Sequence, residues 1–258
     1  MNNSSNDQQR FPTHRHLGGD VLRIAGIALA YFFAHQLAFF FPDAEQVIML
    51  IWPAGGIGLA AFLLNPRRLW PALTLAFYIA GVTADVFLAD RSFLTGVGYM
   101  TGNMIESLGC AWLILYWAGE FRNFTRVREI LALIVSAVCV NAFSACFGAG
   151  TAVLTRGASF IDSWQAWFIA DGLGVLLVGP FIVTWMSVKD AIAGVRSKKI
   201  IEGLGFTIVW GLMTWGVFQP DIFAHRFGFH PYILVALLAW PAIRLGQRGV
   251  TLALILSG

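Results

Sequence analysis

The sequence has little charge for its length. Only 12% of its 258 residues are Asp, Glu, Lys or Arg, whereas a soluble globular domain carries about 25%. Hydrophobic residues make up 58% of the chain, which excludes a soluble core and indicates a polytopic membrane protein. The net charge of +3 arises from loops between the hydrophobic segments, so we expect no nucleic-acid partner.

Cysteine is scarce as well, and each of Cys110, Cys139 and Cys146 lies in an apolar segment. This excludes a disulfide framework, and the spacing is not that of metal ligands. The chain also lacks a phosphate-binding loop and a nucleophile elbow. We therefore expect no catalytic residue, no metal site and no cofactor in this segment.

Eight apolar segments approach or reach the roughly 20 residues needed to cross a bilayer. They are residues 21–41, 47–65, 69–89, 95–118, 129–154, 163–188, 203–220 and 231–245. We predict an all-α membrane bundle of about eight complete helices over residues 21–258, preceded by a polar cytoplasmic tail, 1–20. The tail and the apolar stretch after it show no cleavage site, so the first helix is expected to remain as a signal anchor.

Residues 249–258 are similar to the first half of a further helix and are too short to span. We expect the chain to be cut from a longer protein with about ten membrane helices and a cytoplasmic part that follows them. The alternative is that 249–258 lie along the membrane interface.

Basic residues crowd into every second loop, which predicts the orientation of the chain. Fourteen of the 17 Lys and Arg residues fall in one set of loops, and only Arg91, Arg156 and Arg226 fall in the other. The first set is Arg10, Arg15, Arg23, Arg67, Arg68, Arg122, Arg126, Arg128, Lys189, Arg196, Lys198, Lys199, Arg244 and Arg248. Basic loops stay in the cytoplasm, so the N-terminus is predicted to be cytoplasmic.

Ionisable side chains within membrane segments are functional candidates because their burial in lipid is costly. His35, Asp85 and Asp171 fall in the outer half of their predicted helices, and Glu106, with Asn103 one turn away on the same face, lies no deeper than the midplane. We interpret them as a polar pocket that opens toward the periplasm. The alternative is a structural role, in which they hold helices together by hydrogen bonds.

Two motifs that disturb the backbone flank this zone. In Trp52-Pro53-Ala-Gly55-Gly56, the proline and glycines predict a kinked or unwound helix, and close packing of small residues is the alternative. The second motif is Trp164-Gln-Ala-Trp167-Phe-Ile-Ala-Asp171-Gly172-Leu-Gly174, followed by Pro180. Here Trp167 lies one turn from Asp171, so an aromatic ring and a carboxylate can line one wall. We predict Pro53, Gly55, Gly56, Gly172, Gly174 and Pro180 as flexible joints.

These motifs, with the turn Arg244-x-Gly246-x-Arg248-Gly249, resemble the membrane-associated sensor family of the first type (MASE, type one), over about residues 21–258. The resemblance implies an input domain of bacterial signalling proteins in the inner membrane. It implies that a histidine kinase, or a diguanylate cyclase or phosphodiesterase acting on cyclic di-GMP, follows in the same polypeptide. A transporter-like membrane protein is implied as a signal source alongside a small ligand, and signalling outputs of this kind often work as homodimers.

We therefore predict a sensory domain whose ligand site is formed by Asp171, Glu106, Trp167, Trp52, Asn103, Asp85 and His35. The competing class is a secondary transporter or permease, which intramembrane carboxylates and a broken helix would also suit. A carrier needs such groups accessible from both sides, whereas here the inner half has almost none, and this favours sensing from one side.

Overall fold

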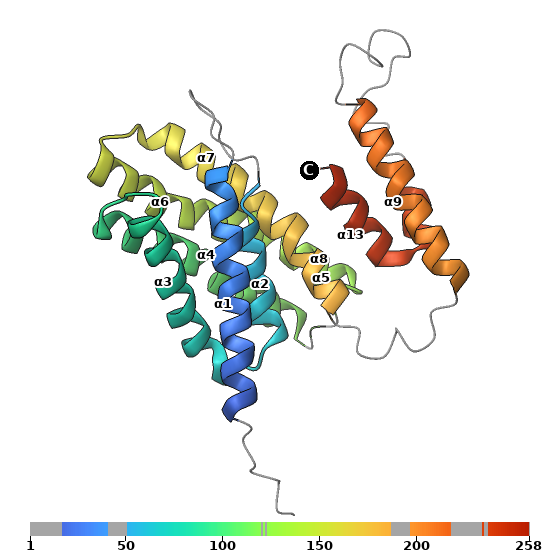
Figure 1. The fold of residues 1–258 in the computed structure, drawn as a ribbon, viewed down its shortest axis with the longest axis horizontal. Coiled ribbons are helices and arrows are strands. Elements are labelled where there is room, and N and C mark those ends of the chain that lie inside the picture. Colours follow the sequence, from blue (N-terminus) through green and yellow to red (C-terminus); the bar gives the residue numbers. More distant parts are fainter. Residues whose placement is uncertain are drawn as a thin grey trace, which may run out of the picture.

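The computed structural model describes residues 17–40, 51–119, 121, 123–186, 197–217, 234 and 237–257. Every regular element in these residues is a helix, and they contain no strand. The prediction of an all-α fold is confirmed. The helices pack as a bundle beside which α9 and α13 form a smaller pair (Figure 1).

The first half of the bundle follows from ordinary start and stop signals. Its elements are α1 (Leu17–Phe40), α2 (Pro53–Leu64), the 3-10 turn η1 (Arg67–Leu69), α3 (Trp70–Phe87) and α4 (Phe93–Ala118). The Asn65-Pro66 pair ends α2, because a residue before proline is disfavoured in helical conformation. Ser92 caps α4 by accepting a hydrogen bond from the backbone N–H of Thr95 at 3.2 Å.

The second half contains two long helices, each with a π-helical segment inside it. α5 (Val127–Val135), η2 (Ser136–Val140) and α6 (Asn141–Arg156) form one of them. α7 (Phe160–Leu173), η3 (Gly174–Val178) and α8 (Gly179–Met186) form the other. A π-segment inserts an extra residue into the helical turn and is often found at functional sites. The remaining helices are α9 (Ser197–Val217), α12 (Ala239–Arg244) and α13 (Gly246–Ser257).

Three helices in the described residues are long and apolar enough to cross a membrane. They are Arg67–Phe87, Val127–Arg156 and Phe160–Met186, which match the predicted spans 69–89, 129–154 and 163–188. α1 and α4 have 24 and 26 residues, which at about 1.5 Å per residue is also long enough to cross a bilayer. The total of about eight spans stays a prediction.

The second predicted span is shorter than expected. The sequence predicts a kinked or unwound helix at Pro53 within residues 47–65, and the chain is unwound there: α2 begins at Pro53 and has 12 residues. Proline at the first helical position is favourable, because its missing N–H would have no partner there and its φ angle is already helical. Trp52, just before it, is extended. Residues 41–50 lie outside the described residues, as do 218–233 of the predicted spans 203–220 and 231–245.

α2 is the central helix of the bundle. It contacts α1, α3, α4, α7, η3 and α8, and most of its residues are buried. Such a position suits the sequence Pro-Ala-Gly-Gly-Ile-Gly-Leu-Ala-Ala, because small residues let neighbouring backbones approach closely. Two of the predicted joints, Gly55 and Gly56, therefore lie in the most tightly packed helix.

Contacts between loops define two ends of the bundle. At one end Arg68 forms an ion pair with Asp20 at 2.7 Å, joining the α2–α3 turn to the start of α1. At the other end Arg91 and Arg156, from the α3–α4 and α6–α7 connections, both lie over the ring of Tyr99. We call these the Asp20 end and the Tyr99 end.

α13 connects the smaller helical pair to the bundle. It contacts α8, η3 and α9, and the hydroxyls of Thr184 in α8 and Thr251 in α13 lie 3.3 Å apart. At the start of α13, Gln247 donates a hydrogen bond to the backbone carbonyl of Phe124. The segment predicted as half a helix thus packs against the bundle through buried residues.

Candidate functional site

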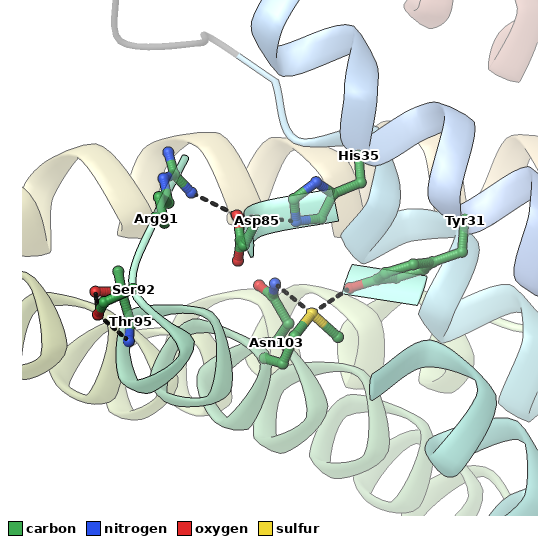
Figure 2. A network of polar contacts seen from close by, with 8 residues as sticks. Tyr31, His35, Asp85, Arg91, Ser92, Thr95 and Asn103 are labelled. Atoms are coloured by element: carbon green, nitrogen blue, oxygen red, sulfur yellow. Dashed lines mark hydrogen bonds and ion pairs between the residues drawn. The ribbon is translucent and has the colours of Figure 1, made fainter. Parts of the chain in front are cut away.

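A chain of polar contacts lies at the Tyr99 end (Figure 2). Arg91 donates a hydrogen bond to Oδ1 of Asp85 at 2.8 Å, and Nε2 of His35 lies 3.8 Å from the same oxygen. Asp85 is fully buried and His35 nearly so. Two residues predicted on separate helices, His35 and Asp85, are thus brought together, and we call them, with Arg91, the outer polar chain.

Trp52 joins the outer polar chain to the helix of Asp171. Its indole packs edge-on against the imidazole of His35, with ring centroids 5.0 Å apart. Its backbone N–H donates to the carbonyl oxygen of Ala170 at 2.8 Å. A displacement of His35 would therefore reach the residue next to Asp171 through a single intervening residue.

Glu106 and Asp171 form a buried carboxyl pair inside the bundle. Their side chains are 0% and 4% exposed, and the two groups lie within electrostatic range of one another. Both oxygens of Glu106 and Oδ2 of Asp171 accept no hydrogen bond from the described residues. In a membrane interior each unsatisfied polar group costs on the order of several kcal/mol. We call Glu106 and Asp171 the carboxyl pair.

The surroundings of the carboxyl pair come from α4 and α1. Asn103 and Ser107 are buried on the Glu106 face of α4, and the Ser107 hydroxyl has no hydrogen-bond partner in the described part of the chain. Tyr31 and Asn103 both donate to the sulfur of Met100, at 3.8 and 3.7 Å, which is a weak acceptor. The predicted face of Asn103 and Glu106 is thus the buried face of α4.

Glycines bring α2 against the carboxyl pair on one side and against η3 on the other. A Cβ on Gly55 would lie 3.0 Å from Oε2 of Glu106. A Cβ on Gly56 would lie 2.7 Å from the backbone nitrogen of Gly179 and overlap the carbonyl oxygen of Gly174. These glycines are required for space, and whether they also act as joints stays a prediction.

The remaining predicted joints lie in or beside η3. Gly172 faces Asn141, whose side-chain nitrogen would lie 2.9 Å from a Cβ there. The same Asn141 amide donates to the carbonyl oxygen of Phe168 at 2.7 Å. Pro180 is the second residue of α8, and its carbonyl accepts a hydrogen bond from Thr184 at 2.8 Å. Polar side chains therefore satisfy the backbone on both sides of the π-segment.

Trp167 lies in a recess formed by glycines of two helices. A Cβ on Gly148 of α6 would overlap its indole, and one on Gly102 of α4 would lie 3.3 Å from it. Its ring centroid is 5.3 Å from that of Tyr99. Gly102 of α4 and Gly148 of α6 thus form the two sides of this recess, and Trp167 links Asp171 to the Tyr99 end.

Sequence reasoning did not identify Tyr31, Arg91, Tyr99, Ser107 or Arg156 as site residues. Tyr31 had a usable signal, because it lies one turn before His35 on the same helix. Arg91 and Arg156 also had a usable signal, since they are two of the three basic residues in the set of loops that carries few Lys and Arg. The sequence does not predict that both arginines contact the ring of Tyr99.

The described residues contain no group of three His, Cys, Asp or Glu side chains that could hold a metal ion. All three cysteines are free, with Cys110 buried beneath Glu106 and the other two exposed on the bundle surface. The site offers carboxyl, amide, hydroxyl and aromatic groups, which can bind and orient a ligand.

A family model, MASE1, matches residues 21–258 of the chain. No curated protein and no solved structure matches it.

Proposed function

The chain belongs to the MASE1 family of membrane sensory input domains, and we propose that it detects a ligand or partner within the membrane or at its periplasmic side. The response would regulate a cytoplasmic effector in the same polypeptide. The observation that carries this proposal is the carboxyl pair, two buried acids with unsatisfied oxygens where burial of such groups is costly. Because burial of these two carboxyl groups costs free energy, a role in binding explains their presence more simply than a role in packing.

The predicted ligand residues fall into two connected groups. The outer polar chain is open to the Tyr99 end through Arg91, whose side chain is 28% exposed. Trp52 and Trp167 connect that end to the carboxyl pair. A signal molecule or partner at the Tyr99 end would therefore act on Asp171 and Glu106 through the direct contacts of Trp52 and Trp167.

The route from this site to the effector leads through η3 and α8. A ligand shifts an equilibrium only by its differential affinity for two arrangements, so two packings of the helices are required. η3 follows Asp171 directly and presses against α2, and α8 contacts α13 through Thr184 and Thr251. Movement of the Asp171 segment would change how α13 leaves the bundle.

The effector that we propose is a histidine kinase or an enzyme of cyclic di-GMP metabolism, as members of the family precede such domains. The signal would be a small ligand or a transporter-like membrane protein, and the protein would act as a homodimer in the bacterial inner membrane. The grouping of loops at two ends supports a multi-pass chain with a cytoplasmic N-terminus, because the Asp20 end carries most of the basic residues.

The orientation can be measured by cysteine labelling. Ser159 and Thr125 are exposed at opposite ends of α5–α7. In a background with the native cysteines replaced by alanine, we expect Ser159→Cys to react with a membrane-impermeant maleimide in cells with a permeabilised outer membrane. Thr125→Cys should react only after the inner membrane is opened. The reverse pattern would overturn the proposed orientation.

Asp171→Asn tests the sensing role of the carboxyl pair. The substitution keeps the size of the side chain and removes its charge, so we expect loss of the stimulus-dependent change in effector output with unchanged membrane insertion. The measurement is effector output of the full-length protein, as autophosphorylation or cyclic di-GMP level, across conditions that change the wild-type output.

Asp162→Asn is the matched control, because Asp162 lies in the first turn of the same helix and is exposed. It should respond like the wild type. An Asp171→Asn protein with a full response would sink the assignment of the carboxyl pair to sensing.

A further inference from the structure

Two arginines converge on one aromatic ring at the Tyr99 end. The guanidinium carbon of Arg91 lies 5.2 Å from the ring centroid of Tyr99, and that of Arg156 lies 5.5 Å from the same centroid. Arg91 lies in the α3–α4 loop and Arg156 is the last residue of α6. With Arg226 they are the three basic residues on the side of the predicted topology that carries few Lys and Arg. Cation–π contact with a single ring does not neutralise two cations, so an anion held by both guanidinium groups would reduce their mutual repulsion.

Among the described residues, only one of the two arginines, Arg91, forms an ion pair with an acidic side chain, although Asp85 also lies within electrostatic range of Arg156. Asp85 forms an ion pair with Arg91 at 2.8 Å. Asp90 and Asp162 are exposed in the neighbouring loop and helix, yet neither forms an ion pair with Arg156 among the described residues. Arg156 follows the last apolar turn of α6, where a cation suits the helix C-terminus, but this does not explain why its guanidinium lies over a ring of α4.

The platform beneath the arginines is fixed. Tyr99 is 4% exposed and packs against Trp167, which the glycines of α4 and α6 hold in turn. The loop of Arg91 is closed by the Ser92 cap, and α6 ends at Gly157 in left-handed conformation, φ +65°. Both guanidinium groups are therefore held near the Tyr99 ring without a cost of ordering long loops.

We propose that Arg91, Tyr99 and Arg156 form a binding site for a phosphate oxyanion, either a soluble phosphate compound or the phosphate of a lipid headgroup. Guanidinium groups offer paired N–H donors that match the oxygens of phosphate. The bound anion would share Arg91 with Asp85. The site then has direct contact with the outer polar chain, so occupancy would be felt at His35 and Trp52.

Binding of the anion is independent of the proposed function, whereas its effect on signalling depends on it. The two can fail separately. An anion that binds without changing effector output would leave the site intact and remove its signalling role, and loss of sensing in Asp171→Asn would say nothing about the arginines.

The test is a titration of the chain in nanodiscs of phosphatidylcholine with inorganic phosphate, at constant ionic strength. The apparent dissociation constant is taken from the shift of the thermal unfolding midpoint with concentration. We expect saturable stabilisation of the wild type, and an affinity about tenfold weaker in Arg156→Gln, because a charge-assisted hydrogen bond is lost. Arg156→Lys, which keeps the charge without the paired donors, should lie between them.

A second arm replaces part of the lipid with phosphatidylglycerol and omits phosphate. Stabilisation that depends on Arg156 only in this arm identifies a lipid headgroup as the source, and stabilisation in the phosphate arm identifies a soluble one. Arg68→Gln is the matched control, because Arg68 is a half-exposed arginine at the opposite end. Stabilisation that is absent in both arms, or equal in wild type and Arg156→Gln, would overturn the proposal.

Discussion

Replacing Gly174 by alanine is expected to lower the free energy of unfolding by about 3 kcal/mol or more, at or above the upper end for overpacked sites. A Cβ at this position would overlap the carbonyl oxygen of Trp52 and lie 2.9 Å from its carbonyl carbon. Both atoms belong to the backbone, and the N–H of Trp52 is itself held by Ala170 at 2.8 Å. Neither can move aside without separating α2 from η3.

The reason for glycine here is space and not backbone conformation. Gly174 has φ −56° and ψ −48°, which any residue adopts. A second glycine, Gly56, presses against the same junction from α2. The substitution therefore tests how closely Trp52 and α2 pack against η3. Close packing there is what would let η3 transmit a change from Asp171 to α2.

Gly150→Ala is the control for this experiment. Gly150 also lies inside a helix, and a Cβ there would meet no atom within 4 Å. We expect a change of less than about 1 kcal/mol, in the stabilising direction if helix propensity acts. Unfolding of the purified chain in mixed micelles measures both variants, and equal stabilities for Gly174→Ala and Gly150→Ala would contradict the packing described here.

The sequence indicated the parts of the fold that depend on local composition. Continuous apolar runs predicted the helices at 67–87, 127–156 and 160–186 to within a few residues, because length and hydropathy alone decide such spans. It also indicated that Asn103 and Glu106 share a face, since helical periodicity places them there.

Of the two forms predicted at Pro53, a kinked or an unwound helix, the structure has the unwound one. Proline and glycine indicate that a helix is disturbed, but they do not indicate whether it bends or ends there. In the structure Trp52 is extended and donates its N–H to another helix. A backbone bond of that kind joins segments far apart in the chain, and no local pattern contains it.

The contacts that define the candidate site have the same long-range character. Sequence reasoning placed His35 and Asp85 at similar depth but did not pair them, because depth gives no information about which helices are neighbours. It also treated Arg91 and Arg156 only as evidence for topology. Their shared position over Tyr99 depends on α3, α4 and α6 meeting at one end, which is a property of the packing.

The second large effect is expected from Asp85→Asn, which should lower the free energy of unfolding by about 3 kcal/mol. Removal of one partner from a buried ion pair leaves the other charge uncompensated and costs roughly 3–5 kcal/mol. The lower end applies because the side chain of Arg91 is 28% exposed and can turn toward water, whereas Asp85 itself is fully buried. Thermal or denaturant unfolding of the purified chain measures the change.

Asp20→Asn provides the comparison, since it removes the same charge from an ion pair of nearly the same length. Arg68 and Asp20 are 2.7 Å apart, but their side chains are 51% and 20% exposed, and such pairs contribute at most about 1 kcal/mol. The difference between their losses in free energy of unfolding therefore measures the effect of burial on ion pairs of nearly equal length. If Asp85→Asn were no more costly than Asp20→Asn, the outer polar chain would be a set of solvated surface contacts. It could then no longer connect an event at the Tyr99 end to Trp52 and the carboxyl pair.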